Sequence, residues 1–213
     1  MEDLMGNQQL NTLDDRIKLL ARNGRLGDGS LWKHPNGRNY KLINTSTKPE
    51  ILSVKQGIAP EIFKTGIRSM DLSKARGRFA NAKPMFRLAS TVHPIFTEYK
   101  TKSHEEIFSE LKLDDFILWF VDDGCVYQRK DSNSKRYILC IGPSISTESR
   151  REALSVALHT LFGPKFGRFE KNNSKATIDN MSWFPPTWLG RVFVDGFESF
   201  KRRYGRSPET SSL

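Results

Sequence analysis

The chain has few of the residues that cross-link a small fold through disulfides or bound metal. Only two cysteines, Cys125 and Cys140, occur in 213 residues, so neither a disulfide framework nor a cysteine zinc site is available. We expect both to be reduced thiols in the core. The histidines lack the spacing of a metal motif and are expected to pack or face solvent. They are His34, His93, His104 and His159.

Long apolar runs are also missing. No stretch approaches the roughly 18 apolar residues of a membrane span. The N-terminus, MEDLMGNQQL, is polar and acidic, whereas a secretory signal would be basic and then apolar. We therefore expect no membrane partner and no secretion.

What the sequence has in excess is positive charge. Lys and Arg number 34 against 24 Asp and Glu, for a formal net charge of +10, which points to a polyanionic partner. The basic residues lie on strand-like and loop-like segments rather than on one amphipathic helix, which favours nucleic acid over a membrane surface. A hydrophobic content of 37% argues against disorder.

The sequence repeats itself once. Leu26–Ser46 and Val121–Ser144 follow one plan: an apolar residue, Asp-Gly, an extended segment, a polar turn and a basic-aromatic second strand. Pro35-Asn36-Gly37 supplies the first turn, since Asn-Gly tolerates positive φ. Helical candidates follow near 48–63 and 146–161, then strand pairs at 66–73 with 84–91 and at 165–171 with 175–183. Short helices near 95–99 and 193–203 close the two copies.

This order predicts an α+β fold with two antiparallel sheets. We expect residues 1–103 to form a first repeat with a short N-terminal extension, 104–206 a second repeat, and 207–213 a flexible tail. Trp183, Phe184, Trp188 and Phe193, around Pro185-Pro186, are expected to form core and turn.

A helix that ends on acids precedes the second Asp-Gly. Phe116–Gly124 reads FILWFVDDG, which places Asp122 and Asp123 at a helix C-terminus, where negative partial charge disfavours a carboxylate unless a cation offsets it. A divalent metal ion would do so.

FILWFVDDG resembles the helix-ending motif of the LAGLIDADG homing endonucleases. In the first copy Ala21–Gly29 takes the same place, and the stretch from Arg78 to Phe96 resembles the one before the second motif in a phage and organelle branch of that family. The resemblance implies two pseudo-symmetric repeats, with two motif helices side by side between saddle-shaped antiparallel sheets. It implies a monomeric enzyme that hydrolyses double-stranded DNA at a long asymmetric target with Mg²⁺ or Mn²⁺, in a host cell's cytoplasm or an organellar matrix.

The same resemblance assigns the reacting residues. Asp28 and Asp123 become catalytic metal ligands, because two adjacent carboxylates can share divalent ions. Gly27 and Asp122, which precede them, are kept with the candidate metal site, although Asp122 is expected to be solvated or to lie behind the ligands. A lysine near the end of each repeat often assists catalysis in the family. Lys100 and Lys102 stand in that region.

The candidates for DNA contact follow from strand alternation, since residues at even offsets share one face. The face that continues from each acid carries Ser30, Trp32 and His34 in the first copy, and Cys125, Tyr127 and Arg129 in the second. The DNA-binding candidates are Ser30, Trp32, His34, Arg38, Lys41, Arg76, Arg78, Tyr127, Arg129, Lys130 and Arg136. The basic segment from Gly66 to Arg87, with Arg68 and Arg87, is expected to clamp phosphates.

The first motif departs from the family pattern at Arg22, Asn23 and Arg25, where small or apolar residues normally let the helices touch. Buried unpaired charge is costly. Either the arginines lie on the outer face, or the helix interface is altered and cleavage is impaired. In the second case the chain would act as an intron RNA maturase or a DNA-binding regulator.

Overall fold

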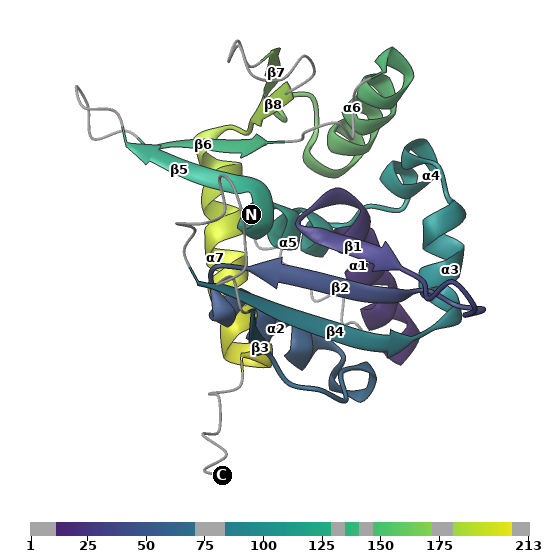
Figure 1. The fold of residues 1–213 in the computed structure, drawn as a ribbon. Helices are drawn as coiled ribbons and strands as arrows, with labels where there is room; N and C mark the ends of the chain where they lie inside the picture. The colour runs from purple at the N-terminus through teal and green to yellow at the C-terminus, as the bar shows by residue number, and fades with distance from the viewer. Residues whose placement is uncertain (1–11, 71–83, 129–134, 141–146, 172–180, 206–213) are drawn as a thin grey trace, which may run out of the picture.

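Two halves of similar order make up the protein. The structure is a computed structural model that describes residues 12–70, 84–128, 135–140, 147–171 and 181–205 (Figure 1). The first half runs α1 (Leu13–Leu26), β1 (Gly29–Trp32), β2 (Lys41–Ser46), α2 (Pro49–Ile58), a 3-10 turn (Pro60–Ile62), β3 (Arg68–Met70), β4 (Met85–Val92) and α3 (Pro94–Thr101). The second begins with α4 (His104–Ser109), which packs on α6, and runs α5 (Leu113–Asp123), β5 (Gly124–Gln128), β6 (Lys135–Cys140), α6 (Glu148–Phe162), β7 (Arg168–Lys171), β8 (Met181–Phe184) and α7 (Thr187–Tyr204).

The two sheets have one topology. Their strand orders are β1-β2-β4-β3 and β5-β6-β8-β7, and all the pairs are antiparallel. Gly29 pairs with Asn44 in the first sheet as Gly124 pairs with Leu139 in the second. The predicted α+β fold of two repeated halves is thus confirmed, and this register gives each residue near the acids a counterpart in the other half.

The motif helices α1 and α5 contact each other at the centre of the molecule. Thr12 begins α1 by accepting the Asp15 N–H at 3.1 Å, and all five residues from Phe116 to Phe120 in α5 are buried. The helix ends come very close: a Cβ on Gly27 would lie 2.5 Å from Oδ2 of Asp122. Glycine is therefore required where α1 meets α5.

Helix α7 ties the halves together. It packs on α5 of its own half and on α2 of the other, and Figure 1 shows it in yellow, running past α2 towards the C-terminus. A Cβ on Gly57 of α2 would lie 1.8 Å from the Tyr204 carbonyl oxygen. The helix starts at Thr187, earlier than the sequence indicated, so Trp188 lies on its first turn and is 36% exposed. Trp183 and Phe193 are core residues, as expected.

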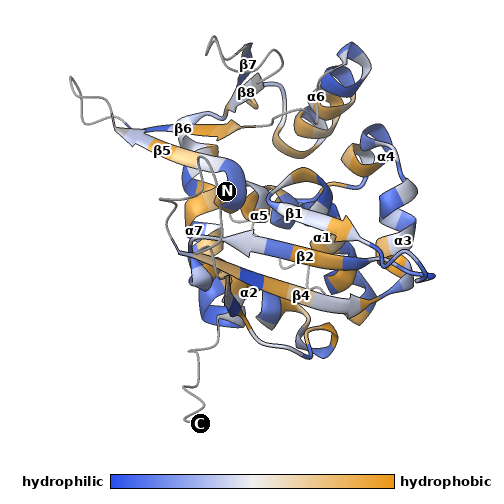
Figure 2. Cartoon of the chain, viewed as in Figure 1, coloured by the Kyte–Doolittle hydropathy of each residue, from blue (hydrophilic) through white to orange (hydrophobic). Residues whose placement is uncertain are grey.

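Each sheet has one face against helices and one open face. Along β2 and β4, Leu42, Asn44, Leu88 and Ser90 are buried and their neighbours are not, and the strands in Figure 2 mix apolar and polar residues accordingly. The expectation of core cysteines is wrong, because Cys125 and Cys140 are both exposed. Cys140 follows the buried Leu139 at the end of β6, and Cys125 is the second residue of β5. In the described ranges, no helix is long and apolar enough to cross a membrane.

Of the two unusual arginines of α1, Arg22 lies in the helix interface and Arg25 on the outer face of the helix, so each of the two expected outcomes applies to one of them. Arg22 lies inside the helix interface, 5% exposed, with Nε 2.7 Å from Oδ1 of Asp115 at the start of α5. Arg25 points away from the interface and donates to the carbonyl oxygen of Lys100, in the last turn of α3, at 2.7 Å. The interface is thus altered by a paired charge rather than broken by a free one.

Removing one partner of this ion pair should destabilise the protein strongly. Arg22→Leu leaves the Asp115 carboxylate buried without its cation, and we expect a loss of about 3 to 5 kcal/mol in the free energy of unfolding, measured by urea denaturation. Adding Asp115→Asn should recover at least half of it. Arg16→Leu is the control, because its pair with Glu61 is exposed and should be worth about 1 kcal/mol or less. Equal losses for both arginines would contradict this account.

Candidate active site

Asp28 and Asp123 stand at the same structural point in the two halves. Helix α1 ends at Leu26, its C-cap Gly27 donates to the Asn23 carbonyl oxygen at 2.8 Å, and β1 starts at Gly29, directly after Asp28. Helix α5 ends at Asp123, and β5 starts at Gly124. Each acid therefore occupies a helix-to-strand corner next to the approach of α1 to α5.

The electrostatics of these acids are those of carboxylates crowded together. Burial raises the pKa of Asp123 to about 7, with further increases from the charges of Asp28 and Asp122, while Trp119 and Lys55 oppose the shift. Burial and then Asp122 raise the pKa of Asp28. A cation between the acids would relieve this repulsion.

Of the two expectations for Asp122, the structure excludes the solvated one. The Asp122 side chain is 3% exposed, and both of its oxygens lie 2.8 Å from Nζ of Lys55, a residue of α2 that is itself 1% exposed. Nδ2 of Asn23 donates to the same carboxylate at 3.0 Å. Sequence reasoning missed Lys55, because a single lysine in an amphipathic helix gives no sign that it points inward.

A small pocket opens beside the acids. It has a volume of about 220 Å³, enough for several water molecules, and is lined by Asp28 and Asp122 on one side and by the polar run Thr45–Lys48 on another, with Ile51, Met85 and Val121 completing the wall. The end of β2 therefore adds hydroxyl groups and a lysine to the site.

The donor set suits a hard divalent ion. Asp28 and Asp123 offer oxygen only, and Mg²⁺ is typically held by one or two carboxylates together with substrate phosphates. Among the described residues, no group of three His, Cys, Asp or Glu is arranged to hold an ion unaided. The residues thus fit a metal ion whose coordination sphere is completed by substrate phosphates.

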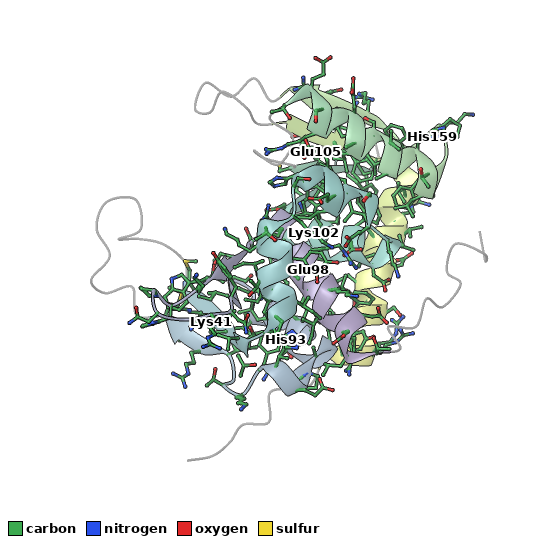
Figure 3. All side chains as sticks on the ribbon, turned by 90° about the vertical axis from the view of Figure 1, so that its right-hand side faces the viewer. Lys41, His93, Glu98, Lys102, Glu105 and His159 are labelled. Atoms are coloured by element: carbon green, nitrogen blue, oxygen red, sulfur yellow. The ribbon has the colours of Figure 1, made fainter. Side chains whose placement is uncertain are left out.

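The two candidate lysines lie elsewhere. Lys102 forms ion pairs with Glu98 and Glu110, and Figure 3 shows it beside Glu98 at the end of α3. Lys100 is exposed on α3, and its carbonyl oxygen accepts from Arg25. Neither contacts Asp28 or Asp123 through an interaction in the described residues, so a catalytic role for them stays a prediction.

The open sheet faces carry most of the DNA-contact candidates that can be placed. Ser30, Trp32, His34, Arg38, Tyr127 and Arg136 are exposed, and Lys41 is half-buried. Nζ of Lys41 lies 4.7 Å from the ring centre of Trp32, so these two side chains form one surface. Arg76, Arg78, Arg129 and Lys130 lie outside the described residues.

A basic pocket lies over β3 and β4 of the first sheet. Arg68 and Arg87 are directly opposite each other on β3 and β4 and both are exposed; like charges so placed repel unless an anion lies between them. With Lys41 they line a pocket of about 280 Å³ that contains no acidic residue.

The second half differs at the equivalent place. There Glu170 faces Ser182, and Glu170 is paired with Arg168. Arg136 and Arg168 line a pocket of about 330 Å³ with Phe184. At this position of the described strands, the first half thus has two facing arginines where the second has Glu170 and Ser182. This asymmetry depends on the pairing of strands and is not visible in composition.

Comparison with solved structures identifies the fold. No protein-family model and no curated protein sequence matches the chain. Among solved structures, its neighbours are LAGLIDADG homing endonucleases, and the chain has their fold. The homing endonuclease I-WcaI, bound to its DNA recognition sequence, gives a TM-score of 0.67 at 15% identity over 95% of this chain and 91% of that one. A variant of I-DmoI, with its target DNA and in the presence of Mn, gives 0.50 at 16% identity over 86% and 94%.

The raised pKa of Asp123 predicts a stability cost that depends on pH. Below about pH 4 the Asp123 carboxyl group is protonated in both the folded and the unfolded state. As the pH rises from 4 towards about 7, only the unfolded state loses this proton, so the free energy of unfolding falls. Above pH 7 the loss of stability persists. Asp123→Asn should therefore raise the free energy of unfolding by about 1 to 2 kcal/mol at pH 8, allowing for solvent screening, and by nothing at pH 4.

Urea denaturation of the metal-free protein at the two pH values measures this effect. Asp14→Asn, on the exposed first turn of α1, is the control and should show no such gain. An Asp123→Asn variant that is less stable than the wild type at pH 8 would contradict the electrostatic account.

Proposed function

We propose that the chain is a site-specific homing endonuclease that hydrolyses phosphodiester bonds of double-stranded DNA by a metal-dependent mechanism. The observation that carries the proposal is the pairing of two carboxylates, Asp28 and Asp123, at equivalent helix ends between two open sheet faces. The fold shared with DNA-bound homing endonucleases supports it, as does the net charge of +10.

The residues divide the work by position. The open sheet faces hold the duplex, with base edges met by side chains such as Trp32 and Tyr127 and phosphates met by the Arg68 and Arg87 pocket. Asp28 and Asp123 would hold divalent metal, Mg²⁺ or Mn²⁺, which when bound activates a water molecule and stabilises the leaving oxygen. Both acids lie where a motif helix passes into the first strand of a sheet. A duplex held on the sheet faces would therefore have its scissile phosphates next to them.

The two halves would read different half-sites. Their open faces carry different residues at equivalent positions, Lys41 against Arg136 and Arg68 against Glu170. A single chain with unequal halves suits a monomer on a long asymmetric target, as a mobile intron or phage element requires. The alternative, a maturase or DNA-binding regulator, rested on Arg22 and Arg25. Arg25 lies outside the helix interface and donates to backbone carbonyl oxygens, whereas Arg22 alters the interface through its pair with Asp115, so the alternative is kept as an outcome of the experiment below.

Loss of either acid should separate cleavage from binding. Asp28→Asn or Asp123→Asn removes a metal ligand while leaving the sheets unchanged, so we expect cleavage of target DNA with Mg²⁺ to fall by at least about 1000-fold and DNA affinity to change little. Nicking of a plasmid that carries the insertion site of the chain's own gene, beside gel-shift binding, measures both.

Asp195→Asn, on the exposed side of α7, is the matched control and should cleave as the wild type does. A wild-type protein that binds this site but never nicks it with Mg²⁺ or Mn²⁺ contradicts the enzyme proposal. If that protein instead binds intron RNA and speeds splicing, the maturase reading takes its place.

The arginine pocket should contribute to binding through phosphates. Arg68→Ala with Arg87→Ala should lower the slope of log affinity against log salt by about 2, since each phosphate contact on duplex DNA contributes about 0.9. Arg168→Ala, whose guanidinium group is already paired with Glu170, should change the slope by less than about 0.5. Fluorescence anisotropy on one duplex over a salt series makes the measurement, and similar slopes for both variants would refute the assignment.

A further inference from the structure

Lys55 is the charged side chain that the proposed mechanism leaves unused. It lies on α2 and is 1% exposed, with Nζ 2.8 Å from both oxygens of Asp122 and 3.3 Å from Oδ1 of Asn44. A lysine this deeply buried is costly unless an anion pairs with it. Here the anion comes from the other half of the protein, one residue before Asp123.

Within the residues that the structure describes, the cluster around Lys55 has no equivalent in the second half. Asn23 of α1 donates to Asp122, and Asn44 of β2 accepts from Lys55. The counterparts of Asn23 and Asn44 in the second half are Leu118 and Leu139, both fully buried apolar side chains. The counterpart of Asp122 is Gly27, whose missing side chain leaves the space that the Asp122 carboxylate occupies. The polar cluster is thus a specific addition to the first half.

The charges next to the candidate metal site are therefore three carboxylates, the buried ammonium group of Lys55 and the exposed Lys48 on the pocket wall. Asp122 acts electrostatically on both Asp28 and Asp123, and Lys55 acts on both with the opposite sign. Both oxygens of Asp122 are engaged by Lys55, whereas Asp28 and Asp123 form no ion pair among the described residues. Lys55 thus pairs with Asp122 and leaves the carboxylates of Asp28 and Asp123 available for a metal ion.

We infer that Lys55 is a positioning residue that serves as the resident cation of the site: it neutralises Asp122 and so limits the carboxylates open to divalent ions to Asp28 and Asp123. This inference rests on the metal site of the proposed function. It assigns to Lys55 a charge role, which sets how strongly the site attracts metal, beyond its part in holding α2 against α5.

A charge role and a merely structural role predict different signs. If Lys55 and Asp122 only hold the fold, removing either should weaken metal binding. If their charges set the field at the site, Lys55→Met should strengthen binding of a divalent ion, because a nearby repulsive charge is gone, and Asp122→Asn should weaken it. The double variant, which has lost both charges, should return to the wild-type affinity.

Titration of the DNA-free protein with Mn²⁺ at pH 8, followed by the loss of the free Mn²⁺ signal in electron paramagnetic resonance, tests this. We expect Lys55→Met to bind roughly three- to tenfold more tightly, Asp122→Asn to bind weaker by a similar factor, and the double variant to lie within about twofold of the wild type. Each single variant leaves one buried charge unpaired. Should either fail to fold, the double variant, which removes both charges, carries the test: the charge role predicts Mn²⁺ affinity within about twofold of the wild type, whereas a merely structural role predicts weaker binding.

The outcomes separate this inference from the proposed function. Weaker Mn²⁺ binding in both single variants, with no recovery in the double variant, overturns the charge role alone. A wild-type protein that binds no Mn²⁺ at all overturns the metal site of the proposed function and the assignment of Lys55 with it.

Discussion

The close approach of α1 to α5 is the constraint on which the rest of the structure depends. Gly27 has no side chain, so the helix ends can meet, and the carboxylate of Asp122 fills the space beside it. Because each helix turns directly into a strand at this point, Asp28 and Asp123 are delivered to one place while the two sheets spread away from them. The geometry that crowds the acids also opens the faces that can hold DNA.

Two ion pairs make this contact specific to unlike halves. Arg22 of α1 meets Asp115 of α5, and Lys55 of α2 meets Asp122 of α5, so in each case the cation comes from the first half and the anion from the second. Buried pairs contribute little net stability but penalise any arrangement that separates them. The halves, though similar in topology, are thus not interchangeable, which agrees with different residues on their open faces.

Much of the fold could be predicted from sequence, because its signals are local. The Asp-Gly repeat and the apolar run of α5 predicted the element order and the places of Asp28 and Asp123. The turn at Asn36-Gly37 is present, with Gly37 donating to the His34 carbonyl oxygen, but neither residue has the positive φ expected of a tight hairpin. Three features could not be predicted from sequence, because they depend on contacts between distant segments and on strand register. They are the burial of Asp122, the inward orientation of Lys55 and the facing positions of Arg68 and Arg87. The core position expected for Cys140 was wrong for the same reason, since a one-residue change in strand position moves a side chain from core to solvent. For Cys125 the strand alternation from Asp123 already indicated the open face.

The central claim is that Asp28 and Asp123 together hold divalent ions at a DNA phosphate. A crystal of the protein with its selected target duplex and Mn²⁺, measured at a wavelength where manganese scatters anomalously, tests it most directly. The account predicts anomalous density within about 2.0 to 2.3 Å of carboxylate oxygens of both Asp28 and Asp123 and beside a backbone phosphate. Density at neither acid, in a complex where the duplex lies on both sheets, would contradict it.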